Sequence, residues 1–289
     1  MQTTAPAAGN DAASLLAGSI DIHVHSYPDD RPRSIDAIDV ARLAQARGMR
    51  AIVLKNHYES TAGLAYIVRK VVPGIEVFGG VDLNLTVGGI NPAAVEHMTR
   101  VSGGWGRIVW MPTFDAENQV RVAKENRPSV AVARSGELVP AVREVLALIA
   151  KHGLVLATGH SSPPEALMLL AEARRAGVRA AVVTHAMNTP VLMDVPQMQQ
   201  AAKLGALIEF VGGSVTGSGA AERMDRFADA IRRIGPSSCI LASDLGQQGN
   251  ALPPDGFGAF LVALRSRGFT ENELALMAKQ NPATLLGLR

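Results

Sequence analysis

The sequence contains almost no cysteine and lacks any long apolar segment. Cys239 is the only cysteine among 289 residues and lies in an apolar run, so a disulfide framework is excluded and the thiol is expected to fill a core position. No stretch of about 18 apolar residues is present, and the first residues do not have the pattern of a signal peptide. These absences predict a cytoplasmic protein with no membrane partner. We expect residues 1–18 to form a flexible leader.

The chain also lacks an excess of charge of either sign. Its 28 basic and 26 acidic residues give a formal net charge of +2. Proteins that bind nucleic acid or an anionic membrane surface need a concentration of basic residues, which this balance does not supply. We therefore expect a small-molecule partner and no nucleic acid. The sequence leaves open whether the chain forms a homo-oligomer.

The sequence does contain a regular alternation of short apolar runs and longer amphipathic segments. Runs rich in Val, Ile, Leu and Ala predict eight strands, at residues 19–25, 51–55, 76–81, 107–111, 154–158, 181–184, 206–210 and 239–243. Apolar residues at helical spacing predict helices at residues 35–46, 140–152, 163–176, 195–204 and 221–234. Strands that alternate with helices are typical of a parallel sheet.

Such a sheet is compatible with two arrangements, an open doubly wound sheet and a closed barrel. An open doubly wound sheet usually has a glycine-rich phosphate-binding turn after its first strand, and here that turn reads His-Val-His-Ser-Tyr-Pro. A barrel instead repeats one unit, and the order helix, glycine, strand recurs at residues 46–53, 151–156, 175–182 and 203–208. We therefore predict an α/β fold, a distorted (β/α)8 TIM barrel that forms a single domain over residues 19–289.

Histidines gather at the predicted strand ends. The carboxyl ends of barrel strands form one face, where catalytic groups from several strands meet. His97 and His152 lie on helical segments, but the other histidines lie at or just past a strand end: His23, His25, His57, His160 and His185. A single histidine at such a position is commonly a satisfied structural residue, and a lone His-x-His is a weak motif. Their joint placement is what indicates a site.

A metal site is the chemistry that these residues favour. Strand alternation places the rings of His23 and His25 on one face, with Cα atoms about 7 Å apart. The fifth and sixth strands end in His160 and His185, and the eighth ends in Asp244. Four imidazoles and one carboxylate suit zinc, with manganese or iron as alternatives. Asp244 is also expected to act as the general base toward a metal-bound water.

In this order, these residues resemble the amidohydrolase superfamily. Its members have His-x-His after strand 1, single histidines at the ends of strands 5 and 6, and an aspartate at the end of strand 8. The segment 279–287 resembles the superfamily's C-terminal helix. The resemblance implies a metal-dependent hydrolase but selects no particular member. It assigns the metal to His23, His25, His160, His185 and Asp244.

The sequence departs from this pattern at strand 4. Binuclear members are expected to carry a bridging lysine or glutamate there, but the strand ends Val109-Trp110-Met111. Lys55, at the end of strand 2, is a candidate for a substitute bridge, an oxyanion partner or a substrate-binding cation. We therefore expect one tight metal ion and leave a second one open.

Three further residues are assigned to the pocket or its support. His57 is expected to polarise a carbonyl or stabilise an oxyanion. Asn84 and Trp110 are candidate substrate-binding residues, although a role in a turn or in packing explains each equally well. Glu209 interrupts an apolar strand and is a candidate to orient a metal-binding histidine.

The leading function is hydrolysis of an amide, lactam, lactone or ester bond through a metal-activated water. The first alternative is a non-hydrolytic, metal-dependent decarboxylase of a small aromatic-type acid, similar to the aminocarboxymuconate semialdehyde decarboxylase group, because such members lack the strand 4 bridge. The second is a TatD-like phosphoesterase or nuclease, which the missing strand 4 glutamate and the even charge disfavour. A barrel that only binds metal or acts as a scaffold is the non-enzymatic alternative.

Overall fold

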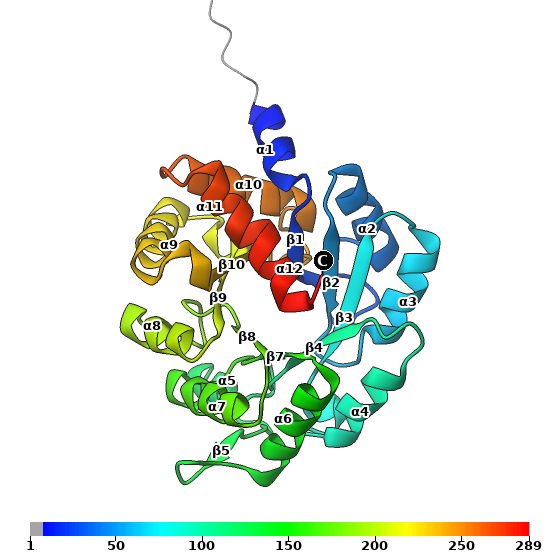
Figure 1. Ribbon diagram of the computed structural model, residues 1–289, viewed down its shortest axis with the longest axis vertical. Helices are drawn as coiled ribbons and strands as arrows, with labels where there is room; N and C mark the ends of the chain where they lie inside the picture. The colour runs from blue at the N-terminus through cyan, green and yellow to red at the C-terminus, as the bar shows by residue number, and fades with distance from the viewer. Residues whose placement is uncertain (1–7, 289) are drawn as a thin grey trace, which may run out of the picture.

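The computed structural model describes residues 8–288, which form a nearly closed barrel of eight parallel strands surrounded by helices (Figure 1). The strand order is β1-β2-β3-β4-β7-β8-β9-β10. The bounds are Ile20–His25 (β1), Ala51–Lys55 (β2), Glu76–Asp82 (β3), Gly106–Trp110 (β4), Val155–Ala157 (β7), Ala180–Val183 (β8), Leu207–Val211 (β9) and Cys239–Ala242 (β10). The predicted (β/α)8 fold is confirmed, and all eight predicted strands are present.

The strands were recognisable because both of their faces are buried. Ile22, Ile108 and Ile240 belong to the cluster that fills the barrel interior. Residues that alternate with them, such as Leu54 and Val109, pack in the layer between the strands and the helices. Continuous apolar runs are therefore required along each strand.

The helices occupy the segments between the strands. Their bounds are Ala8–Leu16 (α1), Ala37–Ala46 (α2), Ala62–Val71 (α3), Pro92–Arg100 (α4), Glu117–Val122 (α5), Pro140–His152 (α6), Pro163–Arg175 (α7), Val195–Lys203 (α8), Ala220–Ile234 (α9), Pro253–Arg265 (α10), Glu271–Ala275 (α11) and Asn281–Leu286 (α12). The five predicted helices correspond to α2, α6, α7, α8 and α9. Within residues 8–288, no helix has the length and apolarity needed to cross a membrane. A small hairpin, β5 (Ala133–Arg134) with β6 (Glu137–Leu138), lies in the connection from β4 to α6.

Helix α1, which precedes the first barrel strand, packs against α10 on the outside of the barrel. Leu16 is buried, and Asp11 forms an ion pair with Arg265 of α10. A Cβ at Gly258 would lie 2.9 Å from Leu16 Cδ1, so glycine allows this close approach. Residues 1–7 of the expected leader lie outside the described residues. Residues 8–16 form α1, in which Leu15 and Leu16 are buried. The division at residue 18 stays a prediction.

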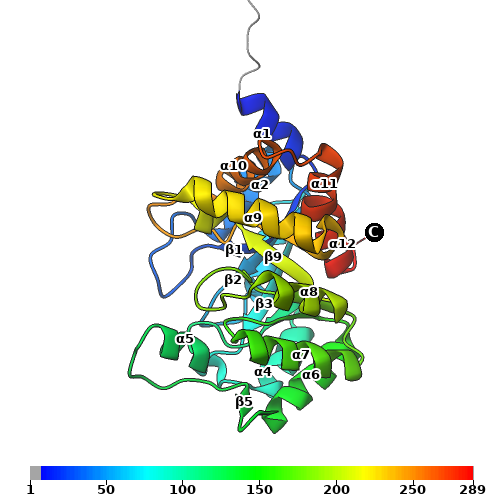
Figure 2. The same cartoon turned by 90° about the vertical axis from the view of Figure 1, so that its left-hand side faces the viewer.

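The amino end of the barrel is covered by the C-terminal helices. Leu285 and Leu286 of α12 join the interior cluster of the barrel. The Asn281 side chain donates a hydrogen bond to the Cys239 carbonyl at the start of β10 (2.7 Å). Figure 2 shows α11 and α12 on the side opposite the long connections that follow β1 and β4. The carboxyl ends of the strands, on that opposite side, therefore carry the cavity.

The barrel closes between β10 and β1 through a side chain as well as the backbone. Asp21 Oδ1 accepts hydrogen bonds from the backbone N–H groups of Ser243 (2.9 Å) and His23 (3.1 Å). Burial raises the pKa of Asp21 to about 6. The register of β1 against β2 shifts between Asp21 and Val24, so β1 carries a bulge there. The bulge turns His23 into the barrel directly after Ile22, which also faces the interior.

Candidate metal centre

A cavity of about 540 Å³ opens at the carboxyl end of the barrel. It is lined by residues from six of the eight barrel strands or the loops that follow them, as expected for this fold. All five predicted metal ligands and both predicted catalytic partners meet there: His23, His25, Lys55, His57, His160, His185 and Asp244.

Three of these residues form a compact group of potential ligands. His23 Nε2 lies 3.1 Å and His25 Nε2 lies 3.3 Å from Asp244 Oδ1. The potential ligand atoms of the three residues all lie within 4.8 Å of one another. They come from β1 and the end of β10, the two strands that meet where the barrel closes.

His160 and His185 form a second group beside the first. Their Nε2 atoms lie 3.1 Å apart, and the rings of His23 and His185 stack with centroids 6.0 Å apart. Burial lowers the pKa of both His160 and His185; the neighbouring His185 lowers that of His160 further, and His23 lowers that of His185, so both rings are uncharged at neutral pH. Gly159, directly before His160, has φ +60°, and a Cβ there would lie 2.1 Å from the Met111 carbonyl oxygen. Glycine is therefore required for His160 to reach the cavity.

The donor chemistry fits a divalent cation. His23 Nδ1 donates to Glu209, and His160 Nδ1 donates to Gln119 Oε1 (2.9 Å), which leaves the Nε2 atom of each ring facing the cavity. These Nε2 atoms lie 3.1 Å from Asp244 Oδ1 and His185 Nε2, where a proton or a cation must lie between each pair of atoms. Imidazole nitrogens with one carboxylate are the ligand set that zinc prefers. The residues therefore fit the metal that the sequence predicts.

Opposing effects set the charges of the first group. Burial alone would raise the pKa of Asp244, but His23 and His25 outweigh it and hold that pKa below its ordinary value. Burial alone would lower the pKa of His23, but Asp244 and Glu209 raise it above its ordinary value. Asp244 is thus a carboxylate near neutral pH, the form that binds a metal or accepts a proton.

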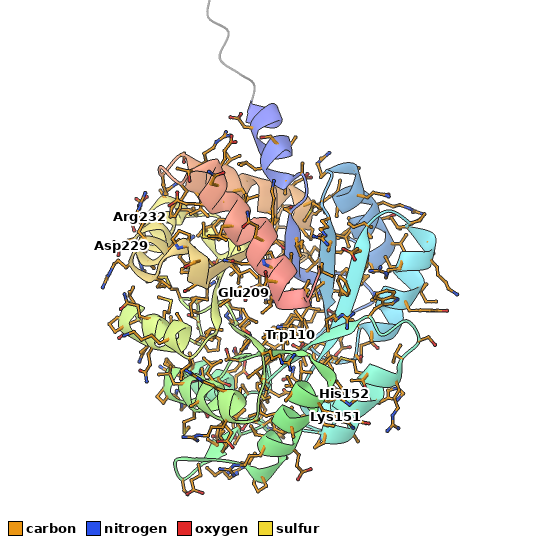
Figure 3. All side chains as sticks on the ribbon, viewed as in Figure 1. Trp110, Lys151, His152, Glu209, Asp229 and Arg232 are labelled. Carbon is orange, nitrogen blue, oxygen red and sulfur yellow. The ribbon has the colours of Figure 1, made fainter. Side chains whose placement is uncertain are left out.

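Glu209 of β9 orients two of the histidines. Its Oε1 accepts a hydrogen bond from His23 Nδ1 (3.1 Å), and its Oε2 accepts one from the backbone N–H of His185 (2.7 Å). Glu209 is buried and lies toward the centre of the barrel (Figure 3). A carboxylate that fixes the tautomer and direction of an imidazole is the usual support of a metal ligand. The sequence suggested this role for Glu209, and the structure shows which histidines it contacts.

Glu209→Gln is expected to weaken metal affinity about 10–100-fold, the usual effect of losing such a support. A glutamine has one acceptor oxygen, so it cannot accept from both His23 and His185 as the carboxylate does. Competition with a chelator measures the effect. Asp229→Asn on the exposed face of α9 is the matched control and should leave the affinity unchanged. Equal affinities in wild type and Glu209→Gln would contradict this role.

Two of the predicted ligands have a strained backbone. His185 has φ +27° and Asp244 has φ +49°, values that residues with a Cβ rarely adopt. Hydrogen bonds from Asp244 N to His23 O (2.9 Å) and from Leu245 N to Ser243 Oγ (3.2 Å) hold the second of these turns. Strain of roughly 1–3 kcal/mol per residue persists only where the surroundings impose it, and it is common at functional sites.

Lys55 lies beside the histidines as one partner of a buried ion pair. Its Nζ is 3.1 Å from Asp82 Oδ2, and both side chains are at most 1% exposed. Thr113 Oγ1 donates to the same oxygen (3.0 Å). Burial raises the pKa of Asp82, and Lys55 limits that rise. A bridging carboxylated lysine would place a second anion against Asp82, so the contacts favour Lys55 as a cation.

Asp82 was missing from the residues predicted by sequence. The predicted third strand stopped at residue 81, whereas β3 includes Asp82 as its last residue. Its position at a strand end was the available signal, the same one that identified the histidines. Its partner, Lys55, lies on the neighbouring strand β2, and only the pairing of β2 with β3 brings the two together.

His57 is held at the edge of the cavity between polar and aromatic contacts. Its Nδ1 lies 2.8 Å from Thr113 Oγ1 and 3.2 Å from Asp82 Oδ2. Its ring stacks on His25, with centroids 4.9 Å apart, and contacts Phe114 at 4.1 Å. Burial and the charge of Lys55 lower the pKa of His57 well below its ordinary value, so the ring is neutral.

Asn84 and Trp110 lie beneath the cavity and not among the described residues that line it. The amide of Asn84 is occupied: it donates to the His57 carbonyl (2.8 Å) and accepts from the Thr113 backbone (2.9 Å). Trp110 fills the barrel interior, with Lys55 Nζ 5.4 Å from its ring. In the structure these two side chains contact His57 and Lys55, and their predicted role in substrate binding stays a prediction.

Loops and one helix supply the remaining walls of the cavity. Arg31, Arg33, Phe114 and Gln247 of the loops line it, together with Gln119 of α5. Irregular loops carry no periodic signal, so the positions of these side chains depend on the tertiary structure.

Solved structures of other proteins share the fold of this chain. No protein of curated function matches the sequence. An amidohydrolase from Pseudomonas aeruginosa superimposes with a TM-score of 0.67 at 13% identity, over 96% of this chain and 98% of that one. The organophosphorus hydrolase from Deinococcus radiodurans gives 0.62 at 17% identity, over 96% and 94%. A hydrolase engineered for organophosphates from a weak promiscuous lactonase template gives 0.62 at 17%, over 96% and 97%.

At these identities, the likeness concerns the fold. It confirms the (β/α)8 barrel that the sequence predicts. A sequence model described as a family of unknown function, DUF6282, matches residues 18–209, well over half of the chain. The chain therefore belongs to the DUF6282 family.

Proposed function

We propose that this protein is a metal-dependent hydrolase that cleaves an amide, lactam, lactone or ester bond of a small molecule. The observation that carries this proposal is the convergence of His23, His25 and Asp244 within 4.8 Å in the wall of an open cavity, with His160 and His185 beside them. The fold shared with an amidohydrolase and an organophosphorus hydrolase supports it.

The metal is held by His23, His25, His160, His185 and Asp244 in this proposal. Zinc suits these ligands best, with manganese or iron as alternatives. When bound, such an ion polarises a carbonyl group and lowers the pKa of a water molecule. Since β4 offers no lysine or glutamate at its end and Met111 is buried there, one tight ion is proposed.

The protein's own groups move the proton and hold the substrate. Asp244 is a carboxylate at neutral pH, so it can accept the proton of the attacking water and pass it to the leaving group. Lys55 and His57 face the same cavity, where the ammonium group can bind a substrate oxygen and the neutral ring can accept a hydrogen bond from a substrate donor. Asp82 holds Lys55 through an ion pair, and Thr113 holds His57 through a hydrogen bond.

Asp244→Asn is expected to lower turnover by about 10²–10⁴, because an amide cannot accept the proton. A panel of small esters, lactones, lactams and amides, assayed with zinc-loaded protein, measures this effect. Asp39→Asn, on the exposed face of α2, is the matched control. Wild-type turnover by Asp244→Asn, or no hydrolysis of any bond class by metal-loaded wild type, would contradict the proposed hydrolase.

Decarboxylation of a small aromatic-type acid is the second candidate. The observation that favours it is the absence of a bridging side chain at the end of β4, a pattern expected of mononuclear decarboxylases. Release of carbon dioxide from candidate acids, followed with the same metal-loaded protein, separates the two reactions. Carbon dioxide release without hydrolysis of the panel would select the decarboxylase.

A further inference from the structure

The cavity is lined by more basic than acidic side chains. Lys55, Arg31 and Arg33 line it, whereas Asp244 is the one carboxylate among the described residues of its wall. Charges around a cleft act together on a molecule that enters it, so the pairing of each basic group decides which charge the cavity favours.

Two of the three basic groups form ion pairs with carboxylates that do not line the cavity. Lys55 pairs with buried Asp82. Arg33 pairs with Asp29 through Nε (2.8 Å) and Nη2 (2.7 Å), and the Asp29 side chain is fully buried. These pairs contribute little net charge to the cavity.

Arg31 is different, because the contacts of its guanidinium group within residues 8–288 are uncharged. Its Nε donates a hydrogen bond to the Tyr58 hydroxyl (2.7 Å), and its guanidinium carbon lies 4.0 Å above the Phe114 ring. No carboxylate of the described chain lies within ion-pair distance of it. The backbone N–H of Arg31 donates to Asp29 (3.0 Å), which ties the loop down. The guanidinium group is thus held in place while its charge remains uncompensated.

Phe114 connects Arg31 to the histidines. Its ring lies 4.1 Å from the centroid of His57 and 5.8 Å from that of His160, on the path from Arg31 to these rings. The positive charge therefore stands one aromatic ring away from the candidate metal ligands. A small molecule can reach both.

We propose that Arg31 binds the carboxylate of an organic acid whose apolar part lies against Phe114. A guanidinium group presents a planar pair of donors that matches a carboxylate. One uncompensated cation matches one negative charge, which favours a carboxylate over a doubly charged phosphate. If the proposed function holds, the reacting bond of this acid lies over His23, His25 and Asp244, and the substrate class is anionic.

Calorimetric titration of the full-length protein with benzoate, benzamide and inorganic phosphate tests this subsite. Benzoate and benzamide have nearly the same shape and differ in charge. Wild type is expected to bind benzoate more tightly than benzamide. Arg31→Met should weaken benzoate binding by at least about tenfold, or 1.4 kcal/mol, and Arg31→Lys should restore part of it. Arg42→Met, which removes an exposed arginine of α2, is the matched control and should change nothing.

Equal benzoate affinity in wild type and Arg31→Met, or no benzoate binding by wild type, would overturn the proposal. So would binding of phosphate alone that depends on Arg31, because the site would then be one for phosphate. Tyr58→Phe, which removes the hydroxyl anchor and keeps the charge, should weaken benzoate less than Arg31→Met does. Circular dichroism checks that each variant folds.

The same titrations, run on zinc-loaded and on chelator-treated protein with metal content measured, separate this inference from the proposed function. Arg31-dependent benzoate binding by a protein that takes up no metal would support the subsite and contradict the hydrolase. Metal uptake and turnover without Arg31-dependent binding would contradict the subsite alone.

Discussion

Purified protein is expected to carry about one divalent metal ion per chain, and His23→Ala is expected to carry almost none. The Nε2 atom of His23 lies 3.1 Å from Asp244, so the variant loses a ligand from the centre of the group. It also leaves the buried carboxylate of Glu209 without its imidazole partner. Elemental analysis of both proteins, each reconstituted with zinc and then desalted, measures the difference.

His152→Ala provides the matched control for this experiment. His152 lies on α6 at the outside of the barrel, where its ring contacts Glu96 (3.2 Å), far from the centre in Figure 3. It should bind as much metal as wild type. Two ions per chain would require a second bridging group and would reopen the role of Lys55. No metal after reconstitution would remove the basis of the proposed hydrolase.

Asp82→Asn is expected to destabilise the protein by about 3–5 kcal/mol, the usual effect of removing one partner of a buried ion pair. Lys55 would then be a buried charge without its carboxylate, and Thr113 would lose a charged acceptor. Urea denaturation of metal-free protein, followed by circular dichroism, measures the free energy of unfolding.

The double variant Lys55→Met/Asp82→Asn tests whether the pair is the cause. Because neither charge is left buried, this variant should be more stable than Asp82→Asn alone. Glu76→Gln at the partly exposed start of the same strand, where Arg50 is a partner, should cost less than about 1 kcal/mol. An Asp82→Asn variant as stable as wild type would show that Lys55 is not held as a buried cation.

Much of the fold was accessible from sequence because its signals are local. Each barrel strand is buried on both faces, so most of its length must be apolar, and residues 51–54 of β2 are an example. Helices α6 and α7 have proline in the first turn, and glycine follows α6 directly. The glycines of α10, including Gly258, obscured a helical signal, and the packing of α1 explains why one of them is there.

The candidate ligands were also accessible, since the end of a strand is a position that sequence can locate. His23, His160 and Asp244 all line one cavity because the carboxyl ends of parallel strands share one end of a barrel. How deep a side chain lies in the barrel, in contrast, cannot be read from how far its residue is from a strand end. Trp110 and Asn84 therefore point beneath the cavity, where they support its walls.

The sequence by itself determined the eight strands, their parallel arrangement and the residue types available for a metal. The tertiary structure alone decided the contacts between distant residues. Glu209 meets His23 across 186 positions, and Arg31 reaches the Phe114 ring on another loop. Such contacts depend on how strands and loops are set beside one another. That arrangement follows from packing of the whole barrel and leaves no periodic pattern along the chain.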